Sequence, residues 1–108
     1  MTSRFPGLPN VLERWVEDNG AELTRRGVSF SLEFSDSERS KLSSWLTLET
    51  DENVGRVTVW DSGEAELECA DVEVGTVWNE SRNISSDQEV LDLIGVLLAR
   101  IGRDFSVS

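Results

Sequence analysis

Hydrophobic and polar residues alternate with two different periods along this chain. Apolar residues recur every three or four positions from Leu8 through VLERWVEDNGAELTRRG (11–27) and again in SSDQEVLDLIGVLLARIG (85–102), which predicts an amphipathic helix in each segment. Between them, short runs alternate with a period of two, which is typical of strands with one buried face. The pattern therefore predicts a helix, about five antiparallel strands and a second helix.

The two predicted helices have clear apolar stripes and recognisable ends. The stripes consist of Leu8, Val11, Leu12, Trp15, Val16 and Leu23 in the first helix, and of Val90, Leu91, Ile94, Leu97, Leu98 and Ile101 in the second. Gly27 supplies a stop for the first helix, and Asn19-Gly20 weakens the middle of that helix. Ser86 and Glu89 have the spacing of a capping box at the start of the second.

Two strands are predicted before the centre of the chain, at 28–34 and 43–50. In the first, the residues that share the apolar face are Val28, Phe30, Leu32 and Phe34. In the second, Leu46 and Leu48 face the core, while Trp45, Thr47 and Glu49 face outward.

The stretch GRVTVWDSGEAELEC, residues 55–69, predicts a hairpin whose register follows from the direction of its side chains. A three-residue loop at 61–63, with its glycine in the left-handed conformation, pairs Val59 with Ala65 and puts every apolar residue on one face. A two-residue loop would pair Val59 with Glu66 and mix the faces. The outward pairs in the favoured register are Thr58 with Glu66 and Arg56 with Glu68.

The alternation shifts by one residue after Cys69, which predicts a β-bulge near Ala70. Cys69 itself is expected to be an inert core residue under the helices, and a single cysteine excludes an intramolecular disulfide. With a tight turn at Val74-Gly75, the expected pairs are Val72 with Val77 inside and Asp71 with Trp78 outside.

These elements predict one α+β domain over residues 1–108. Each helix has one apolar stripe and the sheet has one apolar face, so both helices should cover the same side. The other face of the antiparallel sheet is then open to water.

The charge of the chain narrows the classes of partner. The chain of 108 residues has 21 acidic and 10 basic residues, a net charge of −11, and the segment from Thr47 to Glu80 alone carries −9. Nucleic acids and anionic membranes are therefore not expected as partners, whereas a basic protein is. Without a signal sequence or a run of roughly 18 apolar residues, the protein is expected to be cytoplasmic.

Catalysis and metal binding are both disfavoured. The chain lacks histidine and tyrosine, and a pair of carboxylates for glycoside hydrolysis would need a cleft. Glu64, Glu66 and Glu68 would lie roughly 6.5–7 Å apart along a strand, without the convergence that calcium requires. No enzyme, metal or cofactor is expected.

Binding of a protein partner is the favoured role of the open face. Carboxylates alone could simply keep a sheet soluble, but tryptophan on such a face is typical of binding surfaces. The predicted partner-binding residues are Trp45, Arg56, Thr58, Trp60, Glu64, Glu66, Glu68, Asp71, Glu73 and Trp78, with Glu80 on the same face. The alternative is structural: Phe5 and Leu8, or Phe105, could fold over the indole rings.

The central block GRVTVWDSGEAELECADVEVG resembles the TriTu immunity proteins in its Gly-Arg-x-Thr-x-Trp, Ser-Gly and Asp-x-Glu-x-Gly motifs. The segment LERWVEDNGAELTRRGVSFS and the C-terminal helix also resemble that family in order and length. The resemblance implies an antitoxin that neutralises an ADP-ribosyltransferase toxin in bacterial competition, as with type VI secretion.

Two functional hypotheses follow. In the first, the chain is a monomeric immunity protein that occludes its cognate toxin domain in a one-to-one complex. In the second, it is a small acidic secretion chaperone that holds an effector client, and it would then be expected to dimerise.

Overall fold

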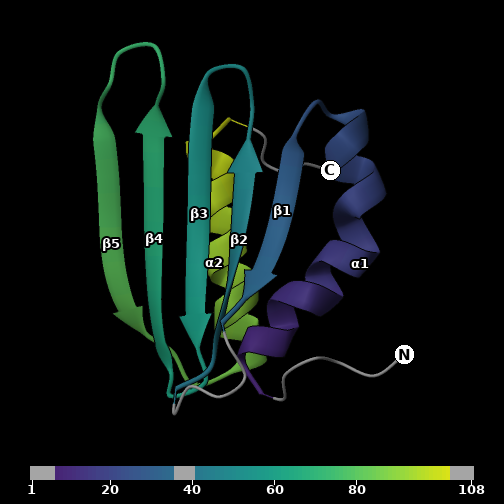
Figure 1. The fold of residues 1–108 in the computed structure, drawn as a ribbon, viewed down its shortest axis with the longest axis vertical. Coiled ribbons are helices and arrows are strands. Elements are labelled where there is room, and N and C mark those ends of the chain that lie inside the picture. The colour runs from purple at the N-terminus through teal and green to yellow at the C-terminus, as the bar shows by residue number, and fades with distance from the viewer. Residues whose placement is uncertain (1–6, 36–40, 103–108) are drawn as a thin grey trace.

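The computed structural model describes residues 7–35 and 41–102 of the chain. The elements are α1 (Pro9–Arg25), β1 (Ser29–Phe34), β2 (Ser43–Glu49), β3 (Asn53–Trp60), β4 (Glu64–Asp71), β5 (Val77–Asn83) and α2 (Asp87–Arg100). The five strands form one antiparallel sheet in which the strands lie in the order of the sequence (Figure 1). The predicted α+β class is confirmed.

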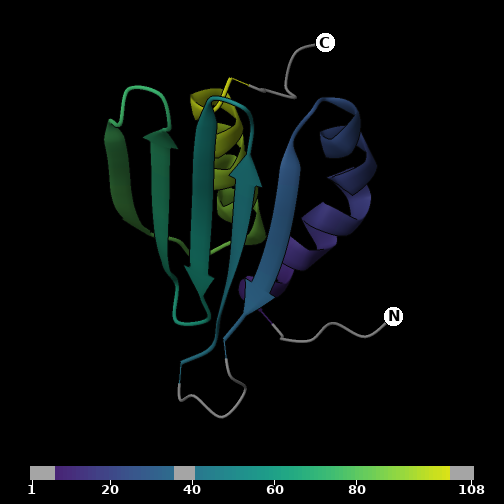
Figure 2. The ribbon, with the colours of Figure 1, turned by 45° about the horizontal axis from the view of Figure 1, so that its top comes forward.

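Both helices lie on the same side of the sheet, as their single apolar stripes predict. α1 packs on β1 and β2, and α2 packs on β3 and β4. In both Figure 1 and Figure 2, α2 lies behind the sheet and α1 flanks it beyond β1. Within the described part of the chain, no helix covers the opposite face, and we call this surface the open face.

The N-terminal helix runs through the Asn19-Gly20 position without a break. Gly20 lies directly against the ring of Phe30, and a Cβ at position 20 would come within 3.0 Å of that ring. The glycine therefore lowers helix propensity but allows β1 to approach α1 closely. The start of α1 is also joined to the sheet, because the buried Ser44 hydroxyl donates to the Pro9 carbonyl at 2.8 Å.

The C-terminal helix begins with the predicted capping box. The Ser86 hydroxyl accepts a hydrogen bond from the Glu89 amide at 3.2 Å. The Glu89 carboxylate accepts from the Ser85 amide at 2.7 Å, one residue earlier than the simplest capping box has it. These bonds satisfy amides at the helix start that have no partner within the helix.

The predicted stripe of α2 is wrong at one position. Leu91 is 38% exposed, whereas Leu93 is fully buried against the sheet. The remaining predicted positions are all buried, and they are Val90, Ile94, Leu97, Leu98 and Ile101. Leu91 and Leu93 lie on either side of the stripe, so the contact with the sheet decides which one is buried.

The central hairpin has the predicted register. Val59 pairs with Ala65 and Val57 pairs with Leu67, and all four side chains are buried. The loop glycine, Gly63, has a φ of +99°, as a three-residue hairpin loop requires. The outer pairs are also as predicted, Thr58 with Glu66 and Arg56 with Glu68.

The register between β4 and β5 differs from the prediction. β4 pairs continuously with both neighbours through Ala70, so the expected bulge is absent from this described strand. The chain turns at 72–75, and Cys69 pairs with Trp78 while Ala70 pairs with Val77. Trp78 therefore lies on the helix side, and Val77 lies on the open face with 70% of its surface exposed. Val72, also expected inside, is exposed in the turn.

The packing of α2 on β3 depends on Gly55, which leads to a stability prediction. A Cβ at position 55 would lie 2.7 Å from Leu97 Cδ1 and 3.2 Å from Ile101 Cγ2. Gly55→Ala should lower the free energy of unfolding by about 1–3 kcal/mol, because a tightly packed core must shift. Gly95→Ala is the matched control, since that exposed position in α2 has open space for a Cβ. It should raise the free energy by about 0.5–1 kcal/mol in the same urea titration.

The capping box leads to a prediction about pH. Hydrogen bonds from the Ser85 backbone amide, and then from its hydroxyl, lower the pKa of Glu89. A carboxylate with a lowered folded-state pKa stabilises the fold above its unfolded pKa, and this stabilisation is lost as the pH falls through the folded value. Glu89→Gln should therefore unfold at a lower urea midpoint than wild type at pH 7, and the difference should shrink towards acidic pH. A difference that stays constant with pH would contradict this role.

Candidate partner-binding surface

The open face gathers most of the residues that the sequence predicts as a partner-binding surface. Side chains of β2, β3 and β4 alternate between the core and this face, and the continuous registers bring the outward positions together. The predicted residues that share the open face are Trp45, Arg56, Thr58, Trp60, Glu64, Glu66 and Glu68. Trp45 pairs with Thr58, which pairs in turn with Glu66, so one row crosses three strands.

The charges of this face are poorly compensated. Glu66 and Glu68 are exposed, and within the described part of the chain neither carboxylate has a hydrogen-bond or ion-pair partner. The Arg56 guanidinium donates to the Thr47 hydroxyl at 3.2 Å instead of pairing with a carboxylate. The face therefore keeps a negative field that a basic partner could neutralise.

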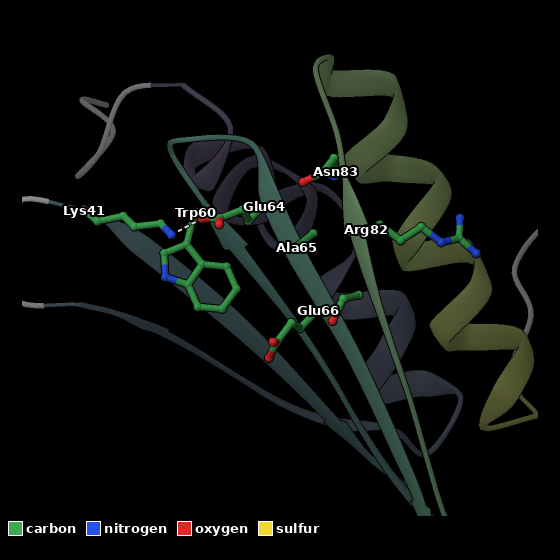
Figure 3. Close-up of a pocket in the computed structure, with 8 residues that line it drawn as sticks. Lys41, Trp60, Glu64, Ala65, Glu66, Arg82 and Asn83 are labelled. Atoms are coloured by element: carbon green, nitrogen blue, oxygen red, sulfur yellow. Dashed lines mark ion pairs between the residues drawn. The ribbon is translucent and has the colours of Figure 1, made fainter.

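Trp60 and Glu64 lie beside a cation of the same chain. The Lys41 ammonium is 5.5 Å from the centre of the Trp60 ring and forms an ion pair with Glu64. Figure 3 shows these three residues and Glu66 together, while Arg82 points away from them toward α2. They line an open hollow of about 420 Å³, with Ser81 and Asn83 on the far wall.

The sequence prediction missed Lys41, Ser81 and Asn83 at this site, although a signal for Lys41 was present. Lys41, Ser43 and Trp45 are two residues apart, so continuing the outward alternation of β2 backwards from Trp45 reaches Lys41. The pairing of the strands continues in the same direction, since the Asp61 amide donates to the Leu42 carbonyl at 2.9 Å. Extending the alternation beyond the predicted start of the strand predicts that Lys41 faces outward.

The predicted placement of Trp78 and Glu80 on the open face is wrong. Trp78 lies on the helix side, packs against the core and stacks with Arg100, whose guanidinium carbon is 3.9 Å from the ring centre. Glu80 also lies on this side, where it forms an ion pair with Arg82. The physical reason is the missing bulge, because an uninterrupted β4 reverses the faces expected for β5.

Asp71 and Glu73 do not join the rest of the predicted surface either. The Asp71 carboxylate accepts from the Glu73 and Val74 amides at 2.9 and 2.8 Å, so it holds the β4–β5 turn. This turn is at the opposite end of β4 from the β3–β4 loop (Figure 1), which directly follows Trp60. The open-face positions of β3, β4 and β5 at that end are instead apolar, namely Val54, Ala70 and Val77.

Of the residues expected to fold over the tryptophans in the structural alternative, Leu8 is described. Leu8 packs against the core, on the helix side of the sheet, whereas Trp45 and Trp60 lie on the open face. Phe5 and Phe105 lie outside the described residues.

Cys69 is a buried free thiol, and burial is the main reason that its pKa is raised. The thiol form is therefore favoured over the reactive thiolate, in agreement with the prediction of an inert core residue. Among residues 7–35 and 41–102, no group of three or more histidine, cysteine or acidic side chains could hold a metal ion. The described helices include none that is long and apolar enough to cross a membrane.

Comparison with known families identifies the chain. The model of the family described as "Immunity protein TriTu" matches residues 10–100, which includes every described strand and helix except the first residue of α1. The chain belongs to the TriTu family of immunity proteins. A comparison with curated proteins finds no match. As a TriTu protein, the chain binds a cognate toxin protein and neutralises it.

The two sides of the sheet lead to opposite predictions for tryptophan substitutions. Trp78→Ala removes a ring that packs on the core and on Arg100, so it should lower the free energy of unfolding by about 2 kcal/mol. Trp45→Ala, on the open face, should change it by less than about 1 kcal/mol. Urea unfolding followed by circular dichroism compares the two variants. Equal losses would mean that Trp45 has a structural role.

Proposed function

We propose that this TriTu protein neutralises an NAD-dependent ADP-ribosyltransferase toxin by docking its open face onto the toxin domain. The observation that supports this most strongly is the combination on one face of two half-buried indole rings, Trp45 and Trp60, with carboxylates that lack partners. The resemblance of the central block to antitoxins of such enzymes supports the class of toxin.

The two kinds of side chain have different roles in this proposal. Trp45 and Trp60 supply rigid apolar area, which is typical of residues that dominate binding energy. Glu66 and Glu68 attract a basic surface over a longer distance and raise the association rate. ADP-ribosyltransferases bind anionic NAD through basic and polar groups, so an acidic face can compete for the same region of the toxin.

The protein acts by occlusion, without turnover, metal or cofactor. The sequence lacks histidine and tyrosine, and the carboxylates of Glu64 and Glu66 line a hollow that is open to solvent. The complex contains one immunity protein and one toxin domain, and it forms in the cytoplasm. The family match favours this role over the secretion chaperone.

Binding kinetics test the roles of the two groups separately. Trp60→Ala should raise the dissociation rate from the toxin domain by about tenfold or more, because loss of a central indole removes about 1.4 kcal/mol or more. The pair Glu66→Gln and Glu68→Gln should instead lower the association rate and weaken its dependence on salt. Surface plasmon resonance at several ionic strengths measures both rates.

A control separates the position of the charges from their number. Glu17→Gln with Asp18→Asn removes the same charge from exposed positions on α1, away from the open face. This variant should bind nearly as wild type does. If it slows association as much as the open-face pair, or if Trp60→Ala binds normally and still protects cells against the toxin, then the partner uses another surface.

The class of toxin has its own test. Purified immunity protein should abolish the NAD-dependent modification of a target protein by its cognate toxin at a molar ratio of one to one. Light scattering on the mixture should give the mass of a one-to-one complex, whereas a dimer of the immunity protein with an unfolded client would support the chaperone hypothesis.

A further inference from the structure

The hollow beside Trp60 has the composition of a site for a single cationic side chain. It is lined by the indole ring of Trp60 and by two carboxylates on one strand, Glu64 and Glu66, with Ser81 and Asn83 opposite. Its volume of about 420 Å³ is ample for one long side chain, and it opens to solvent on the open face.

The chain itself shows that a cation is accepted here. Lys41 places its ammonium 5.5 Å from the Trp60 ring centre while pairing with Glu64. Attraction between a cation and the face of an aromatic ring is strongest for tryptophan, and a neighbouring carboxylate adds to it. Lys41 satisfies only one of the two carboxylates, because Glu66 has no partner among the described residues. The site therefore binds the Lys41 ammonium, and the Glu66 carboxylate is still available to a second cation.

We propose that this hollow receives an arginine side chain of the toxin, whose guanidinium stacks on Trp60 and pairs with Glu66. This inference rests on the proposed function and names the chemistry that the open face recognises. Arginine fits better than lysine, because a planar guanidinium stacks on a ring and donates two hydrogen bonds to one carboxylate at the same time. Lys41 competes with it for Trp60 and repels it.

Binding of a small probe tests the chemistry of the hollow on the isolated protein. Nα-acetyl-arginine amide is titrated at constant ionic strength while the four indole N–H signals are followed by nuclear magnetic resonance. The Trp60 signal should shift and saturate, while those of Trp15 and Trp78, which pack on the helix side, should not. Nα-acetyl-lysine amide should bind more weakly by about threefold or more, since it cannot stack.

Two substitutions locate the probe. Glu66→Gln should weaken the arginine probe by about threefold or more, as expected for loss of a charge-assisted pair. Glu49→Gln is the matched control, because Glu49 is exposed at the other end of the open face and should leave the affinity unchanged. No shift at Trp60, equal binding of the lysine probe, or equal effects of the two substitutions would overturn the assignment.

Removal of the Lys41 ammonium, which competes for the hollow, tests whether the toxin uses it. Lys41→Met should tighten toxin binding by about threefold or more, since both carboxylates and the ring become free. Arg25→Met removes one positive charge from the end of α1 and corrects for the change in net charge. Weaker binding by Lys41→Met, or the same change in both variants, overturns the inference. If it fails while Trp60→Ala still speeds dissociation, the proposed function stands without the arginine.

Discussion

The structure depends on the backbone register of one hairpin, because every side chain of β3 and β4 is assigned to the core or the open face by that pairing. The register is held by more than the alternation of apolar residues. Gly63 has the left-handed conformation that closes the loop, and its carbonyl accepts a hydrogen bond from the Ile84 amide at 2.7 Å. A Cβ at position 63 would lie 2.8 Å from the Ile84 carbonyl oxygen. The loop is thereby joined to the segment that leads from β5 into α2, so the register and the placement of α2 support each other.

The central part of this arrangement could be predicted from the sequence, whereas its edge could not. Val59 and Ala65 belong to strands with strict alternation, and only one loop length keeps their faces consistent. The stretch after Cys69 contains valines at 72, 74 and 77, which imitate a buried face with a shifted phase. Val72 and Val74 are exposed because the chain turns at 72–75, where Asp71 accepts hydrogen bonds from two amides. Val77 is exposed because the register of β5 places it on the open face. The prediction for Trp78 is wrong for the same reason. A turn that is stabilised by a side chain does not change the alternation of apolar and polar residues, so the sequence pattern does not reveal it.

The open face is also a source of instability in the unbound protein. Several carboxylates lie close together on β4 and its neighbours, and their mutual repulsion raises the free energy of the unbound protein. A basic partner removes that repulsion, and any ligand that binds only the folded state stabilises it further. In the complex that we propose, relief of this repulsion contributes to the affinity for the toxin. The core of leucine, isoleucine and valine side chains between sheet and helices supplies the stability that this arrangement requires.

The separation of the two faces by the pleat has a consequence for evolution. Positions such as Trp45, Thr58 and Glu66 point away from the residues that specify the fold, so substitutions there should alter the surface that we propose for recognition with little effect on folding. A lineage confronted with a changed toxin can therefore adjust one outward position at a time, without first acquiring a compensating core mutation. The opposite holds for Gly55 and Gly20, where a single added methyl group meets a neighbouring side chain. Diversification within this family is thus expected to follow alternate residues of the strands, and to spare those between them.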